Sequence, residues 1–143
     1  MRRPLFSLAI RKTERVTTNV PTIDAKATVM EAVQRMVKEN VWSFLVTKDG
    51  LPVGVVTERD ILRRCISKGY SLNMRVEEIM SSPIITIGPD EPIGEALQIM
   101  AEKNIRRLYV VEGGKVIGRI TQTKSMESLL DVLLTLQSLP YQL

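Results

Sequence analysis

Apolar residues near the start of the chain recur first with helical spacing and then in short, strand-like runs. The helical set would share one face of a helix and consists of Val29, Ala32, Val33, Met36 and Val37. Asn40 follows at the point where a left-handed residue often ends a helix. Apolar runs at 44–46 and 53–56 then flank Lys48-Asp49-Gly50, and an Asp-Gly turn between such runs is typical of a β-hairpin. The pattern predicts one amphipathic helix followed by a hairpin.

A second helix is predicted directly after the hairpin. Thr57 and Asp60 have the spacing of a capping box, in which two side chains satisfy the first amides of a helix. Ile61-Leu62-Arg63-Arg64-Cys65-Ile66 continue the helix, and Gly69 is expected to end it.

The same order of elements occurs twice. Shifting the sequence by 64 residues aligns 20–61 with 84–125 without a gap, and about a quarter of the positions are identical. The identities include Thr22 with Thr86, Glu31 with Glu95, Met36 with Met100, Asn40 with Asn104, Gly54 with Gly118 and Thr57 with Thr121. Internal repeats are strong evidence about architecture, and two copies indicate a pseudo-twofold arrangement.

The second copy predicts strands over 84–87, 108–111 and 116–120, a helix over 93–103 and another helix from Ser125 onward. Each copy is thus βαββα, and one copy alone cannot cover its own sheet face. We expect an α/β (α+β) fold of two pseudo-twofold-related repeats packed through their sheets, with an extra apolar C-terminal helix. The expected divisions are a basic segment at 1–15, repeat one at 16–68, connector and repeat two at 69–128, and the C-terminal helix at 129–143.

Composition narrows the functional classes. The formal charge of +4 is ordinary for a globular domain, and there is no histidine and only one cysteine, Cys65. Zinc and haem sites built from nitrogen and sulfur ligands are therefore not expected, and neither is a disulfide within the chain. No dense carboxylate cluster offers an acid–base pair, so we do not expect an enzyme. The apolar stretches near both ends are short or interrupted, which favours a cytoplasmic protein.

The turn after each hairpin carries the candidate chemistry. The two versions are Gly54-Val55-Val56-Thr57-Glu58-Arg59-Asp60 and Gly118-Arg119-Ile120-Thr121-Gln122-Thr123-Lys124. The glycine permits close approach of backbone or ligand. The threonine hydroxyl suits a sugar or phosphate, and an aspartate accepts two hydrogen bonds from a vicinal diol such as ribose. The alternative interpretation is that Thr57 and Asp60 only cap a helix, although Lys124 replaces the acid in the second copy.

The joint order of these features resembles the cystathionine-β-synthase (CBS) domain in its tandem form, the Bateman module. The resemblance covers about 16–128 and includes the lead-in Arg75-Val76-Glu77-Glu78-Ile79-Met80 and the heptapeptide that ends in Asp60. It implies a regulatory module, an energy or metabolite sensor, that binds AMP, ADP, ATP or an S-adenosylmethionine-like ligand as a regulatory ligand and signals to a partner protein. No catalytic cofactor is implied.

The resemblance also implies roles for individual residues. Asp60 would hold the ribose hydroxyls and Thr57 would lie by the sugar or phosphate, beside Val55 and Val56. The base would rest against the first strand of the opposite repeat. Arg106 and Arg107 would bind phosphate, which guanidinium groups can grip with two hydrogen bonds. The strand residues against which the base would rest are Ile84, Ile85 and Thr86.

A second site would be weak, empty or altered. It would combine Thr22, Trp42, Ser43, Thr121 and Lys124. We therefore expect one competent nucleotide site per chain. The alternative to a binding role is a solvated basic rim for Arg106 and Arg107. For Trp42 the alternative is burial in the core.

The last predicted helix bears on the partners. Its apolar residues are expected to be buried, either against the module's own sheet or against a second copy of the chain. We expect a homodimer. The apolar residues concerned are Met126, Leu129, Leu130, Leu133, Leu134 and Leu136. The runner-up function is a ligand-free dimerisation scaffold. A nucleic-acid-binding accessory protein is a weaker alternative, because the basic arm shows no helix-turn-helix pattern. The basic residues of the arm are Arg2, Arg3, Arg11, Lys12 and Arg15.

Overall fold

The computed structural model describes residue 16 and residues 18–139, so the basic arm at 1–15 and the tail at 140–143 lie outside the described residues. The described chain forms two compact units. One spans Val20–Ile85, and the other contains the residues from Thr86 onward.

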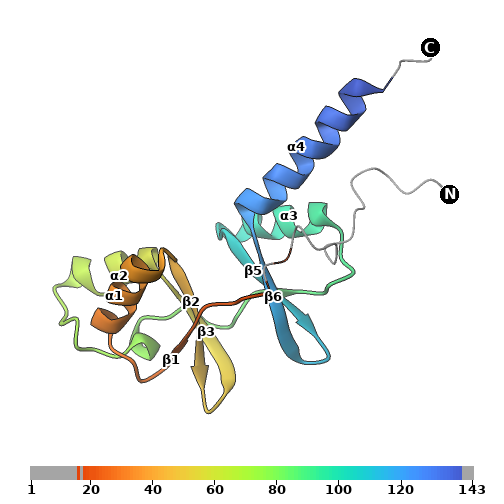
Figure 1. The fold of residues 1–143 in the computed structure, drawn as a ribbon. Coiled ribbons are helices and arrows are strands. Elements are labelled where there is room, and N and C mark those ends of the chain that lie inside the picture. Colours follow the sequence, from red (N-terminus) through yellow and green to blue (C-terminus); the bar gives the residue numbers. More distant parts are fainter. Residues whose placement is uncertain (1–15, 17, 140–143) are drawn as a thin grey trace. The chain divides into compact units, whose positions relative to one another are not determined.

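The first unit is a three-stranded sheet with two helices. In chain order its elements are β1 (Thr22–Asp24), α1 (Val29–Glu39), β2 (Ser43–Lys48), β3 (Leu51–Thr57) and α2 (Glu58–Arg64). β2 is the central strand, parallel to β1 and antiparallel to β3 (Figure 1). The predicted helix and hairpin are confirmed. The second helix is also present, but it ends at Arg64, before the predicted end at Gly69. The core joins the inner faces of sheet and helices and includes Val29, Ala32, Met36, Phe44, Val46, Val56, Ile61 and Cys65.

Local sequence explains where these elements begin and end. Thr28 and Glu31 form a capping box at the start of α1, and Asn40 ends the helix in the left-handed conformation, with φ 54°. The hairpin turn places Asp49 and Gly50 at φ 51° and 77°. Two consecutive residues with positive φ match the right-handed twist of the flanking strands.

Arg35 ties α1 to the first strand. Its guanidinium group donates to the carbonyl of Thr22 at 2.8 Å and lies over the Phe44 ring, 4.5 Å from the ring centre. The hydrogen bond from Arg35 lowers the pKa of the Glu39 carboxyl. A lowered folded-state pKa stabilises the fold at neutral pH, and this contribution is lost as the pH falls through the lowered value. Acid should therefore weaken the pair between Arg35 and Glu39 within α1.

The second unit repeats the design. Its elements are β4 (Thr86–Ile87), α3 (Ile93–Lys103), β5 (Arg107–Glu112), β6 (Lys115–Thr121) and α4 (Gln122–Ser138), with β5 central. The first strand is shorter than predicted. Only Thr86 and Ile87 pair with β5, whereas Ile84 and Ile85 precede the strand.

The C-terminal helix is present, but it is not an extra element. α4 runs without a break from Gln122 to Ser138, so the second helix of the repeat and the predicted helix at 129–143 are one helix (Figure 1). It begins three residues before the predicted Ser125 because Thr121 caps it. Its apolar face is not covered by its own sheet: Met126, Leu130, Leu133 and Leu134 are each more than half exposed.

The connector packs with the first repeat, whereas the sequence grouped it with the second. A short 3-10 helix, η1 (Ile66–Lys68), leads into it and ends at Gly69, with φ 69°. The connector itself contains a second 3-10 helix, η2 (Val76–Glu78). The amide of Val76 donates to Ala27 at 2.8 Å, and the amide of Val29 donates to Met74 at 2.9 Å. The backbone thus fixes the connector, including the turn at Val76–Glu78, to the first unit.

Among the helices in the described part of the chain, none is long and apolar enough to cross a membrane.

Candidate functional site

Thr57 and Asp60 lie where β3 passes into α2, and they form the capping box that the sequence allows. The Asp60 carboxylate oxygen Oδ2 accepts from the Thr57 amide at 2.9 Å and from the Thr57 hydroxyl at 3.1 Å. The Asp60 amide in turn donates to the Thr57 hydroxyl oxygen at 3.3 Å. The predicted capping box is therefore confirmed, since both residues hold the start of α2. Capping does not by itself exclude a binding role.

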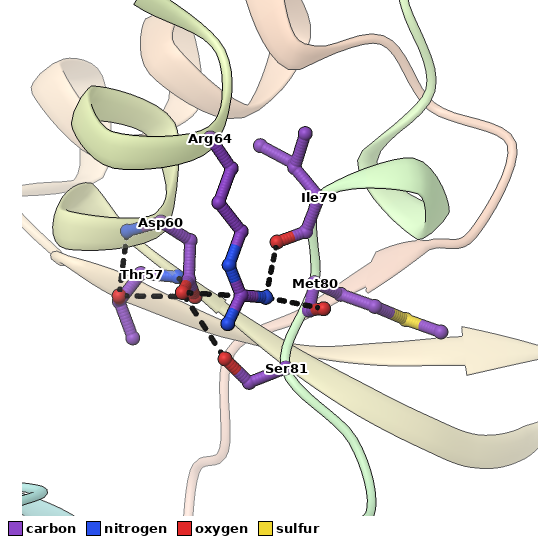
Figure 2. A network of polar contacts seen from close by, with 6 residues as sticks. All are labelled: Thr57, Asp60, Arg64, Ile79, Met80 and Ser81. Atoms are coloured by element: carbon purple, nitrogen blue, oxygen red, sulfur yellow. Dashed lines mark hydrogen bonds and ion pairs between the residues drawn. The ribbon is translucent and has the colours of Figure 1, made fainter. Parts of the chain in front are cut away.

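The second carboxylate oxygen of Asp60 faces the connector. Oδ1 accepts from the Ser81 hydroxyl at 3.1 Å and lies 3.9 Å from a guanidinium nitrogen of Arg64 (Figure 2). Asp60 is only 8% exposed. A buried carboxylate needs hydrogen-bond donors in place of water, and here both of its oxygens have them.

Arg64 fixes the connector over the junction of β3 and α2, which we call the corner of the first unit. The same guanidinium nitrogen donates to the carbonyls of Ile79 and Met80 at 3.0 and 2.8 Å (Figure 2). Beside it, the backbone of Ser81 pairs with Val55 through two hydrogen bonds, of 2.9 and 2.7 Å. The connector thus makes an isolated antiparallel bridge on the free edge of β3.

Gly54 makes this approach possible. A Cβ atom at Gly54 would lie 2.6 Å from the Met80 sulfur and 2.8 Å from the Ser81 carbonyl oxygen. Both distances are shorter than the contacts that Cβ atoms make in folded proteins. The sequence predicted a close approach of either backbone or ligand at this glycine. In this unit the approaching group is the backbone of the connector.

Trp42 and Ser43 stand next to the Thr57 corner. Ser43 pairs with Thr57 in the sheet, and the amide of Glu58 donates to the Trp42 carbonyl at 3.2 Å. The Ser43 side chain is buried, whereas Trp42 is 45% exposed. Core burial of Trp42 is therefore a wrong prediction, because the residue sits at the strand entrance and its ring is not part of the core between helix and sheet.

The second unit has the matching corner with different side chains. Thr121 caps α4 by accepting from the Lys124 amide at 3.2 Å, and the Lys124 ammonium group pairs with Glu127 at 3.4 Å. The amide of Gln122 donates to the Arg106 carbonyl at 2.8 Å, and Arg107 pairs with Thr121 in the sheet. Arg106 is exposed and Arg107 is half-buried. The repeat therefore puts two arginines where the first unit has Trp42 and Ser43.

The predicted ligand-binding residues are thus divided between two described units. Val55, Thr57 and Asp60 gather in the first, and the half-buried Ile84 and Ile85 end its connector. Val56 is fully buried in the core of the first unit. Thr86, Arg106, Arg107, Thr121 and Lys124 belong to the second unit, while Thr22, Trp42 and Ser43 belong to the first. Sites that join residues of both units stay predictions.

Sequence reasoning missed Arg64 and Ser81. Arg64 lies one helical turn after Asp60, a spacing that favours an ion pair and was available as a signal. Ser81 is 21 residues from Asp60 and follows no local pattern. Within the described residues, no group of three or more potential ligands from histidine, cysteine, aspartate or glutamate could hold a metal ion.

Comparison with known proteins agrees with the repeat. The family model for the CBS domain matches twice, over residues 13–67 and 76–124. The CBS domain-containing protein YhcV of Bacillus subtilis is 33% identical over 103 residues, which are 72% of this chain and 74% of that protein. Curated relatives from Methanopyrus kandleri and Arabidopsis thaliana are 34% identical, and the chain spans only about half of their length, 50% and 48%.

Solved structures show the same fold. One is a protein with CBS domains from Burkholderia ambifaria, which superposes with a TM-score of 0.76 and is 27% identical. The superposition covers 88% of this chain and 89% of that one. The CBS domain pair of protein MJ0100, in complex with 5'-methylthioadenosine and S-adenosyl-L-methionine, has a TM-score of 0.74 and 24% identity, over 87% and 96% of the two chains.

Two βαββα units, each with a threonine-capped second helix after its hairpin, coincide with two matches to one family model. The chain therefore belongs to the CBS-domain family, as a tandem pair of CBS repeats.

Proposed function

We propose that this CBS pair is a non-catalytic regulatory module that binds one adenosine-type nucleotide between its repeats and signals to a partner protein. The observation that carries the proposal is the buried carboxylate of Asp60, held beside Thr57 at the corner where the family motif lies. A fixed carboxylate is a suitable acceptor for the two hydroxyls of a ribose. The MJ0100 pair, solved with two adenosine compounds, supports the ligand class through its shared fold.

The difference between the two corners supports one site per chain. The first corner offers an acid for ribose, and the second offers Arg106 and Arg107 for phosphate. A ligand that engages Asp60 and these arginines would use both repeats. The complementary combination has Lys124 in place of the acid, and Trp42 and Ser43 in place of the arginines. A cation accepts no hydrogen bond from a diol, so that combination is expected to bind weakly.

The first test is thermal unfolding of the pure protein with AMP, ADP, ATP, GTP and S-adenosylmethionine, each near millimolar concentration. A ligand at about a hundred times its Kd stabilises a protein by about 2.7 kcal/mol. For a chain of this size the unfolding midpoint should rise by about 5–10 °C. We expect the rise with adenosine compounds and not with GTP. If no adenosine compound moves the midpoint, the proposed ligand class is wrong.

Assembly is the second candidate function, and the exposed apolar side chains favour it. They occur at matching positions 64 residues apart: Leu62 on α2 and Ile66 on the following 3-10 helix η1 in the first unit, and Met126 and Leu130 on α4 in the second. All four are more than half exposed. Apolar patches of this kind mark contacts with other proteins. We propose a homodimer through these helices, which would serve either the nucleotide sensor or a ligand-free scaffold.

Leu130→Glu tests the dimer. A charge placed in an apolar interface should weaken association by about tenfold or more, and light scattering after size exclusion would report a lower mass. Gln137→Glu adds the same charge at an exposed polar position of α4 and should leave the mass unchanged. A monomeric wild-type chain, or equal masses for both variants at every concentration, would contradict the dimer.

A further inference from the structure

The hydrogen-bonding capacity of Asp60 is nearly exhausted within its own unit. An ionised carboxylate offers about four acceptor positions on its two oxygens. Oδ2 uses two of them for the amide and hydroxyl of Thr57. Oδ1 uses one for the Ser81 hydroxyl, while Arg64 stands 3.9 Å away. A vicinal diol that donates twice therefore finds one open position and needs a second.

We propose that the Ser81 hydroxyl is an internal competitor for the ligand at Asp60, and that it must leave Oδ1 before a diol can bind fully. The proposal rests on the proposed function, since it concerns the same carboxylate. It makes Ser81 a residue that sets the affinity of the site without belonging to the family motif.

Of the two residues that donate hydrogen bonds to the Asp60 carboxylate, Ser81 can be displaced at a lower energetic cost than Thr57. The two bonds from Thr57 are part of the helix cap, so their loss would release the start of α2 as well. The Ser81 hydroxyl makes a single contact of 3.1 Å across the corner (Figure 2). Its backbone is held independently by the two hydrogen bonds to Val55. Rotation of one side chain about χ1 therefore frees the acceptor without moving the connector.

Competition of this kind has a definite thermodynamic signature. The Ser81 hydrogen bond stabilises only the empty protein, so its removal should weaken the empty state and leave the bound state unaffected. By linkage, the variant then binds the ligand more tightly than the wild type does. A hydroxyl that instead contacted the ligand directly would give the opposite sign.

Ser81→Ala is the test, with Ser82→Ala as the matched control at the exposed neighbouring position. Calorimetric titration with the adenosine compound that raises the wild-type midpoint most should give about three- to tenfold tighter binding for Ser81→Ala. Ser82→Ala should bind like the wild type. Without ligand, Ser81→Ala should unfold at a lower temperature than the wild type, and with saturating ligand the two midpoints should converge.

The two failures are distinguishable. Wild-type binding combined with equal or weaker binding by Ser81→Ala would overturn the competition and leave the proposed function intact. Absence of binding by the wild type and both variants would overturn the proposed function, and the competition with it.

Discussion

Gly54→Ala is expected to destabilise the first unit by about 3 kcal/mol, because the added methyl group overlaps a backbone carbonyl that cannot move freely. The Cβ atom would lie 2.8 Å from the Ser81 carbonyl oxygen, and Ser81 is tied to Val55 by two hydrogen bonds. Relief of the overlap would require the connector to leave the edge of β3. Urea unfolding followed by circular dichroism should report the loss, with a midpoint in thermal scans lower by about 10 °C.

Gly88→Ala is the matched control for this substitution. A Cβ atom at Gly88 would meet only the Glu91 side chain, at 3.7 Å, an ordinary contact. The exchange of glycine for alanine should there be neutral or slightly stabilising, because alanine restricts the unfolded chain. Equal stability of the Gly54 variant and the wild type would show that the connector does not need this close approach.

Asp60→Ala is expected to weaken binding of the adenosine ligand by about ten- to hundredfold, through loss of charge-assisted hydrogen bonds. The same change should lower the free energy of unfolding by about 2 kcal/mol, because Thr57 and Ser81 lose their acceptor. Titration calorimetry measures the first effect and urea unfolding the second. An unchanged affinity would mean that Asp60 is a helix cap and nothing more.

Glu31→Ala separates these two effects. Glu31 completes the capping box of α1 by accepting from the Thr28 amide at 3.2 Å, and it is exposed. Its removal should lower stability by about 0.5–1 kcal/mol and leave affinity unchanged. If Glu31→Ala weakened binding as much as Asp60→Ala did, the loss of affinity would reflect destabilisation of the unit and not a contact with the ligand.

The repeated architecture was predictable because its signals are local. Each helix has apolar residues at helical spacing, and each hairpin has a turn sequence that tolerates positive φ. The ends of α1 and α3 coincide with Asn40 and Asn104, both left-handed. The capping of α2 was also readable, because Thr57 and Asp60 are three residues apart. The shift of 64 residues then supplied the second copy without further evidence.

Other features depended on contacts that are distant in sequence. The strand at 84–87 was predicted too long because Ile84 and Ile85 are apolar, yet only two residues find a partner in β5. Core burial of Trp42 was the expected alternative because the residue lies near a helix end, and its position at the entrance to β2 leaves it exposed. The early start of α4 has a local cause instead, because the cap at Thr121 starts the helix three residues before the predicted Ser125.

By itself, then, the sequence determined the two βαββα units, their caps and the chemistry of each corner, because helix periodicity, turn residues and caps act over a few neighbouring positions. Only the tertiary structure decided that the connector returns to the edge of β3, that Gly54 serves this approach, and that Ser81 occupies an acceptor on Asp60. Those contacts join residues 21 or more positions apart. No local pattern encodes them, since they depend on how the connector folds back onto the sheet.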